Sequence, residues 1–169
     1  ASIQQNGTAV PLVKEKVIIY DAREEEIPAG PPHPLLVFGL MALACLVISV
    51  LDYKKKKLSL WLDVVLFGST GLVGCMLFFL WFFTDHNDAA YNLNLLWAMP
   101  TNLIALLALK RKPLWLEKYF LVIAILQGLL LVTWWVLPQQ LNTALIPVAA
   151  SLLVRSLLHY RLRKPVVLQ

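Results

Sequence analysis

The densest group of residues that could do chemistry lies at the middle of the chain, in the run Thr84-Asp85-His86-Asn87-Asp88. A carboxylate beside an imidazole can orient a general base or bind a metal ion. Asp85 and His86 are therefore our candidate catalytic residues. The plainer interpretation is a polar loop whose side chains cap the helices on either side. Because His86 is the only imidazole in this run, we expect no metal site, and no pattern indicates a cofactor.

Nucleophilic catalysis within the chain is not indicated. A cysteine nucleophile must lie within hydrogen-bond distance of its histidine base. Cys75 precedes His86 by eleven residues, which is about 16 Å along a helix. Cys45 lies in the middle of another apolar stretch, and the serine and threonine residues show no nucleophile-elbow pattern.

Five apolar stretches must position these side chains. Hydrophobic residues make up 59% of the chain and charged residues 15%, whereas soluble domains have roughly 45–50% and 25%. Each stretch is close to the ~20 residues that cross a ~30 Å hydrocarbon core as a helix. We predict an all-α polytopic membrane protein, a bundle of five transmembrane helices at about residues 34–53, 58–83, 92–109, 114–137 and 141–160.

The basic residues predict the orientation of this bundle. Twelve of the fifteen Lys and Arg residues fall at alternate ends of the apolar stretches, whereas the connections 84–91 and 138–141 contain none. This is the positive-inside pattern. It predicts that the loops at 54–57 and 110–113 and the tail, residues 161–169, are cytoplasmic. The N-terminal arm, residues 1–33, then faces the other side, which is the periplasm if the membrane is a bacterial inner membrane. The same distribution argues against nucleic acid as the reason for the net charge of +5.

The N-terminal arm is the only sizeable segment outside the predicted spans. Residues 9–20 end in a β-rich run and predict one short strand, which would need a sheet supplied by another domain. The chain begins with Ala and carries no signal peptide, although its N-terminus must be translocated. We therefore expect either a processed product or the tail of a longer polypeptide, in which case the arm would be the end of an upstream domain.

Polar residues inside the spans predict how the helices pack. Asp63 and Arg155 are the ionisable residues most clearly within the membrane, and such charges usually pair in the protein interior. We expect an ion pair between them; the alternative is that each side chain reaches separately to the interface. Asn102 and Gln127 are expected to be structural polar residues, with Gln127 forming a hydrogen bond between helices.

The second and third spans carry small residues that predict close packing. Thr70/Gly74 and Gly71/Cys75 are spaced four residues apart, which lets helix backbones approach. In the third span, we expect a small and polar face to point into the bundle and Pro100 to kink the helix. That face comprises Asn94, Ala98, Thr101, Asn102, Ala105 and Ala108.

The stretch 81–100 resembles the membrane half of a family of Bacteroidota inner-membrane proteins. The shared pattern is Thr-Asp-His, then Asn-x-Asn-Leu-Leu-Trp and a Pro three residues after the Trp. It matches Thr84, Asp85, His86, Asn92, Asn94, Trp97 and Pro100. The similarity extends over roughly residues 9–110. In that family, which includes the lipoprotein N-acyltransferase of Bacteroides, a periplasmic papain-like domain precedes the membrane bundle.

The resemblance implies the membrane-anchoring domain of an acyltransferase-like protein, with the catalytic Cys and His upstream of this chain. It implies that Thr84, Asn92, Asn94 and Trp97 face lipid headgroups, and that the partners are the bilayer, the periplasmic domain and a lipoprotein substrate. The alternative is a non-catalytic accessory subunit that contacts other membrane subunits of a respiratory or secretion complex. A transporter would need a solvated polar cavity near Asn102 and Gln127.

Overall fold

The protein is described by a computed structural model that covers residues 2–5, 8–11, 32–84, 90–111 and 113–163. The chain divides into two units, Ala1–Pro31 and Pro32–Gln169. The first contains strands β1 (Ser2–Gln5) and β2 (Thr8–Pro11), which pair antiparallel with Ile3 opposite Val10. Residues 9–11 of the expected strand therefore have a partner within the chain itself. The expected strand residues 12–20 lie outside the described part of the chain.

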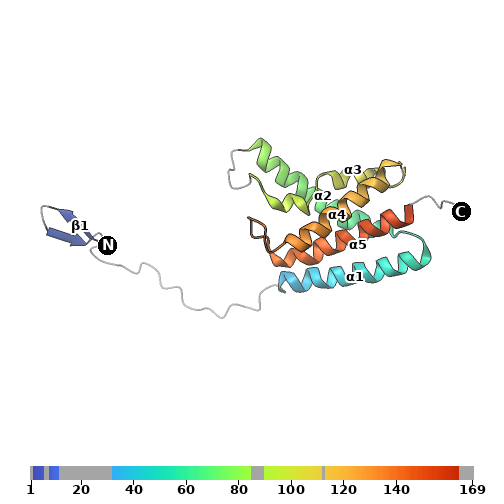
Figure 1. The fold of residues 1–169 in the computed structure, drawn as a ribbon, viewed down its shortest axis with the longest axis horizontal. Helices are drawn as coiled ribbons and strands as arrows, with labels where there is room; N and C mark the ends of the chain where they lie inside the picture. The colour runs from blue at the N-terminus through green and yellow to red at the C-terminus, as the bar shows by residue number, and fades with distance from the viewer. Residues whose placement is uncertain (1, 6–7, 12–31, 85–89, 112, 164–169) are drawn as a thin grey trace. The chain divides into compact units, whose positions relative to one another are not determined.

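The second unit is a bundle of helices (Figure 1). Its long helices are α1 (Pro34–Lys55), α2 (Leu60–Phe83), α4 (Trp115–Thr133) and α5 (Ile146–Arg163). A short 3-10 helix, η3 (Thr143–Leu145), leads into α5. Within the described ranges, α1, α2, α4 and the stretch Thr143–Leu162 are each long and apolar enough to cross a membrane. The prediction of an all-helical polytopic membrane bundle is confirmed.

The ends of α1 follow from local sequence signals. Pro34 occupies the first turn, where its missing N–H costs nothing, and the His33 ring accepts a hydrogen bond from the Leu35 amide at 3.2 Å. At the other end, Lys56 adopts a left-handed conformation with φ 53°, and its N–H bonds to the carbonyls of Asp52 and Tyr53. The chain can therefore turn sharply into α2.

The third predicted span is not one continuous helix, which corrects the expected helix over 92–109. Residues Leu93–Leu96 form a 3-10 helix, η2, and α3 begins only at Thr101 and ends at Ala108. Pro100 therefore marks a break rather than a kink. The reason is that the ring of a proline disfavours helical geometry in the residue before it and removes a backbone donor. Eight residues of α3 rise only about 12 Å.

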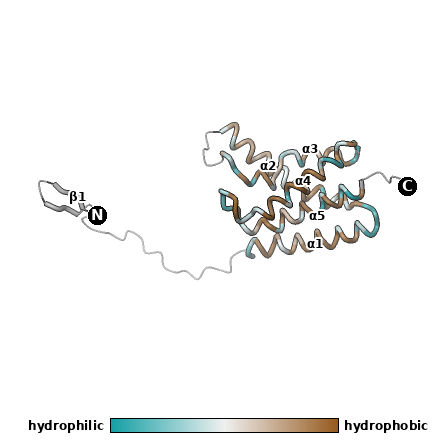
Figure 2. The backbone as a smooth tube through the Cα atoms, viewed as in Figure 1, coloured by the Kyte–Doolittle hydropathy of each residue, from teal (hydrophilic) through white to brown (hydrophobic). Residues whose placement is uncertain are grey.

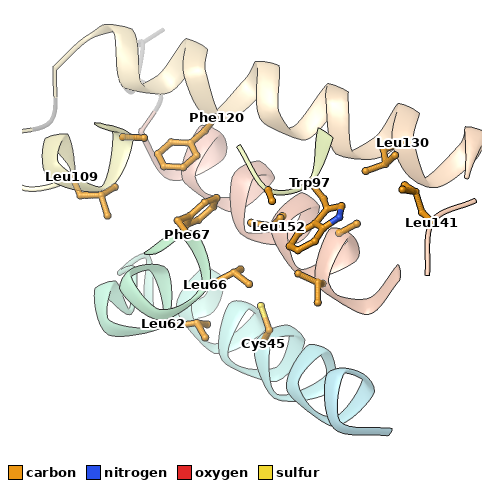
Figure 3. Close-up of a cluster of buried hydrophobic side chains, with 14 of the residues drawn as sticks. Cys45, Leu62, Leu66, Phe67, Trp97, Leu109, Phe120, Leu130, Leu141 and Leu152 are labelled. Carbon is orange, nitrogen blue, oxygen red and sulfur yellow. The ribbon is translucent and has the colours of Figure 1, made fainter. Parts of the chain in front are cut away.

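Helix α5 is the centre of the bundle, because it packs against α1, α2 and α4. In the apolar stretch that includes α5, half of the residues are buried within the protein, compared with 11% of those in α1. α1 is therefore the outermost helix. Figure 3 shows the buried cluster that these helices share, which includes Cys45 of α1, Phe67 of α2 and Leu152 of α5. α3 packs mainly against α2.

The basic connections gather at one end of the bundle. Lys56 and Lys57 of the α1–α2 connection, Lys110 after α3 and Leu162 near the end of α5 line one shared surface hollow. Figure 2 shows hydrophilic segments at this end and hydrophobic colour along the helices. We call this the basic end. The end of α2 at Phe83 lies at the opposite end, as the alternating arrangement requires.

Candidate functional site

The segment between α2 and α3 contains a compact hydrogen-bonded turn. The side-chain oxygen of Asn92 accepts hydrogen bonds from the Asn94 amide at 3.0 Å and from the Asn94 side chain at 2.8 Å, which caps η2. The indole N–H of Trp97 donates to Asn94 Oδ1 at 2.9 Å. The Asn-x-Asn-Leu-Leu-Trp motif therefore encodes one local structure in which each polar side chain has a partner. We call residues 92–97 the asparagine turn.

Trp97 does not face lipid headgroups, which corrects that part of the expectation. Its side chain is only 8% exposed and belongs to the buried core (Figure 3). A tryptophan ring can be buried when its N–H is satisfied, and the bond to Asn94 does this. Asn92 and Asn94 are half-buried. Thr84 is also half-buried, and its hydroxyl donates to the Leu80 carbonyl at 2.6 Å.

Close approach of α2 to the broken segment depends on two glycines. A Cβ atom on Gly74 would overlap the backbone oxygen of Ala98 and would lie 2.8 Å from the nitrogen of Pro100. A Cβ atom on Gly71 would lie 3.1 Å from the backbone nitrogen of Leu103. The expected close packing is confirmed for these glycines, whereas Cys75 is exposed.

Two glutamines satisfy the backbone that the break leaves without helical partners. The side-chain oxygen of Gln139 accepts the Leu93 N–H at 2.6 Å, and Gln127 donates to the Leu96 carbonyl at 2.9 Å. Non-helical backbone at membrane depth persists only where the protein itself supplies such partners. The prediction that Gln127 forms a hydrogen bond between helical segments is confirmed. These contacts fix the asparagine turn to α4 and to the connection after it.

Asn102 joins three helices. Its side chain donates to the Thr70 hydroxyl of α2 at 3.2 Å and accepts from the Tyr119 hydroxyl of α4 at 2.7 Å. The inward face expected for the third span holds for Ala98, Asn102 and Ala105, but Thr101 is exposed. Asn102 and Gln127 are each 1% exposed, so solvent does not reach them as a transporter would require.

A second polar group is buried nearer the basic end and centres on Arg155, whose side chain is fully buried. Arg155 Nε and Nη2 both lie 2.7 Å from Asp63 Oδ1. Arg155 Nη1 lies 2.8 Å from Asp52 Oδ2 and 3.4 Å from the Ser49 hydroxyl. The expected Asp63–Arg155 ion pair is therefore present, and it is extended by a second carboxylate from α1.

The carboxylate of Asp52 also fixes the connection between α1 and α2. Its oxygens accept hydrogen bonds from the backbone N–H and the hydroxyl of Ser59, both at 2.7 Å. The Ser59 carbonyl in turn accepts from Arg155 Nη2 at 3.4 Å. One guanidinium thus ties α1, α2, their connection and α5 together. We call Asp52, Ser59, Asp63, Arg155 and His159 the arginine network.

His159 completes the arginine network one turn after Arg155 on α5. Its Nε2 lies 2.9 Å from Asp63 Oδ2, which is ion-pair distance when the ring is protonated. The ring stacks on Phe120 of α4, with the ring centroids 4.1 Å apart and an interplanar angle of 17°. Phe67 meets the same ring edge-on at 6.1 Å. Among the described residues, no three His, Cys, Asp or Glu side chains are placed to hold a metal ion.

Sequence reasoning missed Asp52, Ser59 and His159 as members of the arginine network. Asp52 lies two residues before four consecutive lysines, and His159 lies two residues before Arg161. Both positions therefore suggested exposed residues at the charged ends of the apolar stretches. The four-residue spacing of Arg155 and His159, which places them on one helix face, was the available signal.

The catalytic candidates Asp85 and His86 lie outside the described residues. The structure describes Thr84, which precedes them, and the asparagine turn, which follows them in the sequence. The structure therefore describes the segments on either side of this candidate site.

Comparisons with known proteins identify the membrane bundle. Searches of curated proteins and of solved structures found no match. The family model described as the Lnb transmembrane domain matches residues 24–165, which is most of the chain and covers every helix described above. The chain belongs to the Lnb transmembrane domain family.

Proposed function

We propose that this domain anchors a periplasmic catalytic domain outside residues 1–169 and takes part in the N-acylation of lipoproteins, with phospholipid as the acyl donor. The observation that carries the proposal is the match to the Lnb transmembrane domain over residues 24–165. In this proposal the protein is a bacterial inner-membrane protein. Its basic end is cytoplasmic, in accord with the positive-inside distribution of its lysines and arginines.

The asparagine turn supports this proposal because it is a rigid element at the end of the bundle that would face the periplasm. Gly74, Gln127 and Gln139 hold it in place. Catalytic and binding groups act best when a rigid scaffold positions them. Thr84, Asn92 and Asn94 would then border the place where a lipid headgroup meets the catalytic domain, and Asp85 and His86 would lie beside it in the sequence.

The proposal is tested with the complete protein in a strain that lacks its gene. The modification of a lipoprotein N-terminus is measured by mass spectrometry, and the amount of membrane-inserted protein by immunoblot. We expect His86→Ala and Asp85→Asn to lower N-acylation at least tenfold at normal protein amounts. The matched control is Gln140→Ala, an exposed polar residue between α4 and η3, which should leave N-acylation unchanged.

Two outcomes would contradict the proposal at different levels. Normal acylation in both variants removes Asp85 and His86 from the mechanism. Normal acylation in the deletion strain itself removes lipoprotein acylation as the function. In that case, co-purification of the protein with a fixed set of membrane subunits would identify an accessory role in a larger complex.

A further inference from the structure

An open groove runs along the outer face of the bundle between α1 and α5. Two hollows of about 440 and 310 Å³ share Leu46 and Val154 among their lining residues, so they form one continuous groove. The hollow farther from the basic end is lined by Ala42 and Ala150, and the nearer one extends to Lys54 and Arg161. We call this the α1–α5 groove. Figure 1 shows α1 and α5 side by side over this length.

The length of the groove matches one leaflet of a bilayer. The thirteen residues from Ala42 to Lys54 span about 18 Å along α1, and the twelve from Ala150 to Arg161 span about 16 Å along α5. One leaflet contributes about 15 Å of the ~30 Å hydrocarbon core. An acyl chain lying in the groove would therefore begin near mid-membrane and reach the interface at the cationic residues.

The interfacial end of the groove is positively charged. Lys54 and Arg161 are both exposed there, and the described residues that line the two hollows include no Asp or Glu. Lys56 adds a third cation close by, with its ammonium 4.2 Å from the centre of the Tyr53 ring. The nearest carboxylate on α1, Asp52, is buried and faces Arg155 and Ser59. Its negative charge is therefore directed away from the groove.

The floor of the groove is held in place by the interior of the protein. Ser49 lines the groove and also contacts Arg155 Nη1 at 3.4 Å, and the Cys45 thiol donates to the Ser151 carbonyl at 4.0 Å. These contacts, together with the Asp52–Arg155 ion pair of the arginine network, join α1 to α5 beneath the groove. A preformed groove binds a flexible chain at a lower entropic cost than a surface that must first be ordered.

We propose that the α1–α5 groove is a binding site for an anionic phospholipid of the leaflet at the basic end. The acyl chain lies along Leu46, Val50 and Val154, and the phosphate pairs with Lys54 and Arg161. Basic pockets between transmembrane helices are a recurrent way of holding anionic headgroups. This site lies at the opposite end of the bundle from the asparagine turn, so it is distinct from the proposed acylation site.

The test is native mass spectrometry of the purified protein with an equimolar mixture of phosphatidylglycerol and phosphatidylethanolamine of equal chain length. The protein should retain phosphatidylglycerol in preference. Lys54→Gln with Arg161→Gln should lower this retention roughly 10- to 30-fold, because each basic residue contributes about fivefold near an anionic headgroup. The matched control, Lys55→Gln with Lys118→Gln, removes two exposed positive charges outside the groove and should change retention less than about twofold.

A second variant tests the acyl-chain part of the groove. Val154→Phe places a ring where the two hollows join and should lower retention of phosphatidylglycerol, whereas Val122→Phe on the exposed surface of α4 should not. Thermal melting in detergent verifies that all variants are folded. Equal retention of the two lipids by the unmodified protein, equal losses in both glutamine pairs, or full retention by Val154→Phe would each overturn the proposal.

Discussion

Replacing Arg155 by methionine should destabilise the protein more than any single substitution among its carboxylate partners. Arg155 is the only described cation that contacts both Asp52 and Asp63, and all its charged contacts are buried. Breaking a buried ion pair by removing one partner costs about 3–5 kcal/mol, because the other charge is left uncompensated. Arg155→Met leaves two such carboxylates.

The two carboxylates would not contribute equally to this loss. Asp52 retains two hydrogen bonds from Ser59 at 2.7 Å, so part of its solvation survives. Asp63 is fully buried, and the contact that remains to it among the described residues is that of His159 at 2.9 Å. We therefore expect Arg155→Met to lower the free energy of unfolding by about 3–5 kcal/mol, with most of the loss arising at Asp63.

The assay is reversible unfolding of the purified protein by SDS in mixed micelles, followed by circular dichroism. A charge-compensated variant, Arg155→Met with Asp52→Asn and Asp63→Asn, should recover more than half of the lost stability, since replacing a whole buried ion pair by neutral groups is often nearly neutral. An unfolding free energy of Arg155→Met within about 1 kcal/mol of the parent protein would refute this reasoning. So would a compensated variant that is less stable than the single one.

Two further substitutions test how α2 and α4 hold the broken segment. Gly74→Ala should lower the free energy of unfolding by at least about 2–3 kcal/mol, because its methyl group would overlap the Ala98 backbone. The control Gly128→Ala, which has open space around it, should be neutral or stabilising by up to ~1 kcal/mol. Equal melting temperatures of the two variants would contradict the close approach of α2 to the broken segment. Gln127→Leu should cost about 1–3 kcal/mol, because the Leu96 carbonyl loses its partner. Hydrogen exchange at residues 93–97 should rise in that variant, and unchanged exchange would argue against this contact.

Much of the bundle was predictable because bilayer thickness imposes a length on apolar segments. The spans that became α1, α2, α4 and α5 were found from hydropathy alone. The prediction of one helix for the third span was wrong, because the length and apolarity of a segment do not show whether its helix is continuous. Pro100 indicated that the helix is interrupted. The break is stabilised by the local cap at Asn92 and by hydrogen bonds from Gln127 and Gln139, which lie far from it in the sequence.

The buried polar contacts were predictable only where a charged residue lies deep in an apolar stretch of the sequence. Two charges deep in apolar stretches, Asp63 and Arg155, stand out in any sequence, and pairing them follows from the cost of leaving either alone. Asp52 and His159 stand near basic clusters, where exposed charges are common. Only the path of α5 between its neighbours shows that they point inward.

The arginine network also has a consequence for biosynthesis. Asp52 and Asp63 are separated from Arg155 by 103 and 92 residues, so both acids leave the ribosome long before their counter-ion is translated. A nascent chain that stops before the last helix would hold two membrane-embedded acids with no guanidinium to neutralise them. The ion pairs that join α1 and α2 to α5 can therefore form only after α5 has been synthesised.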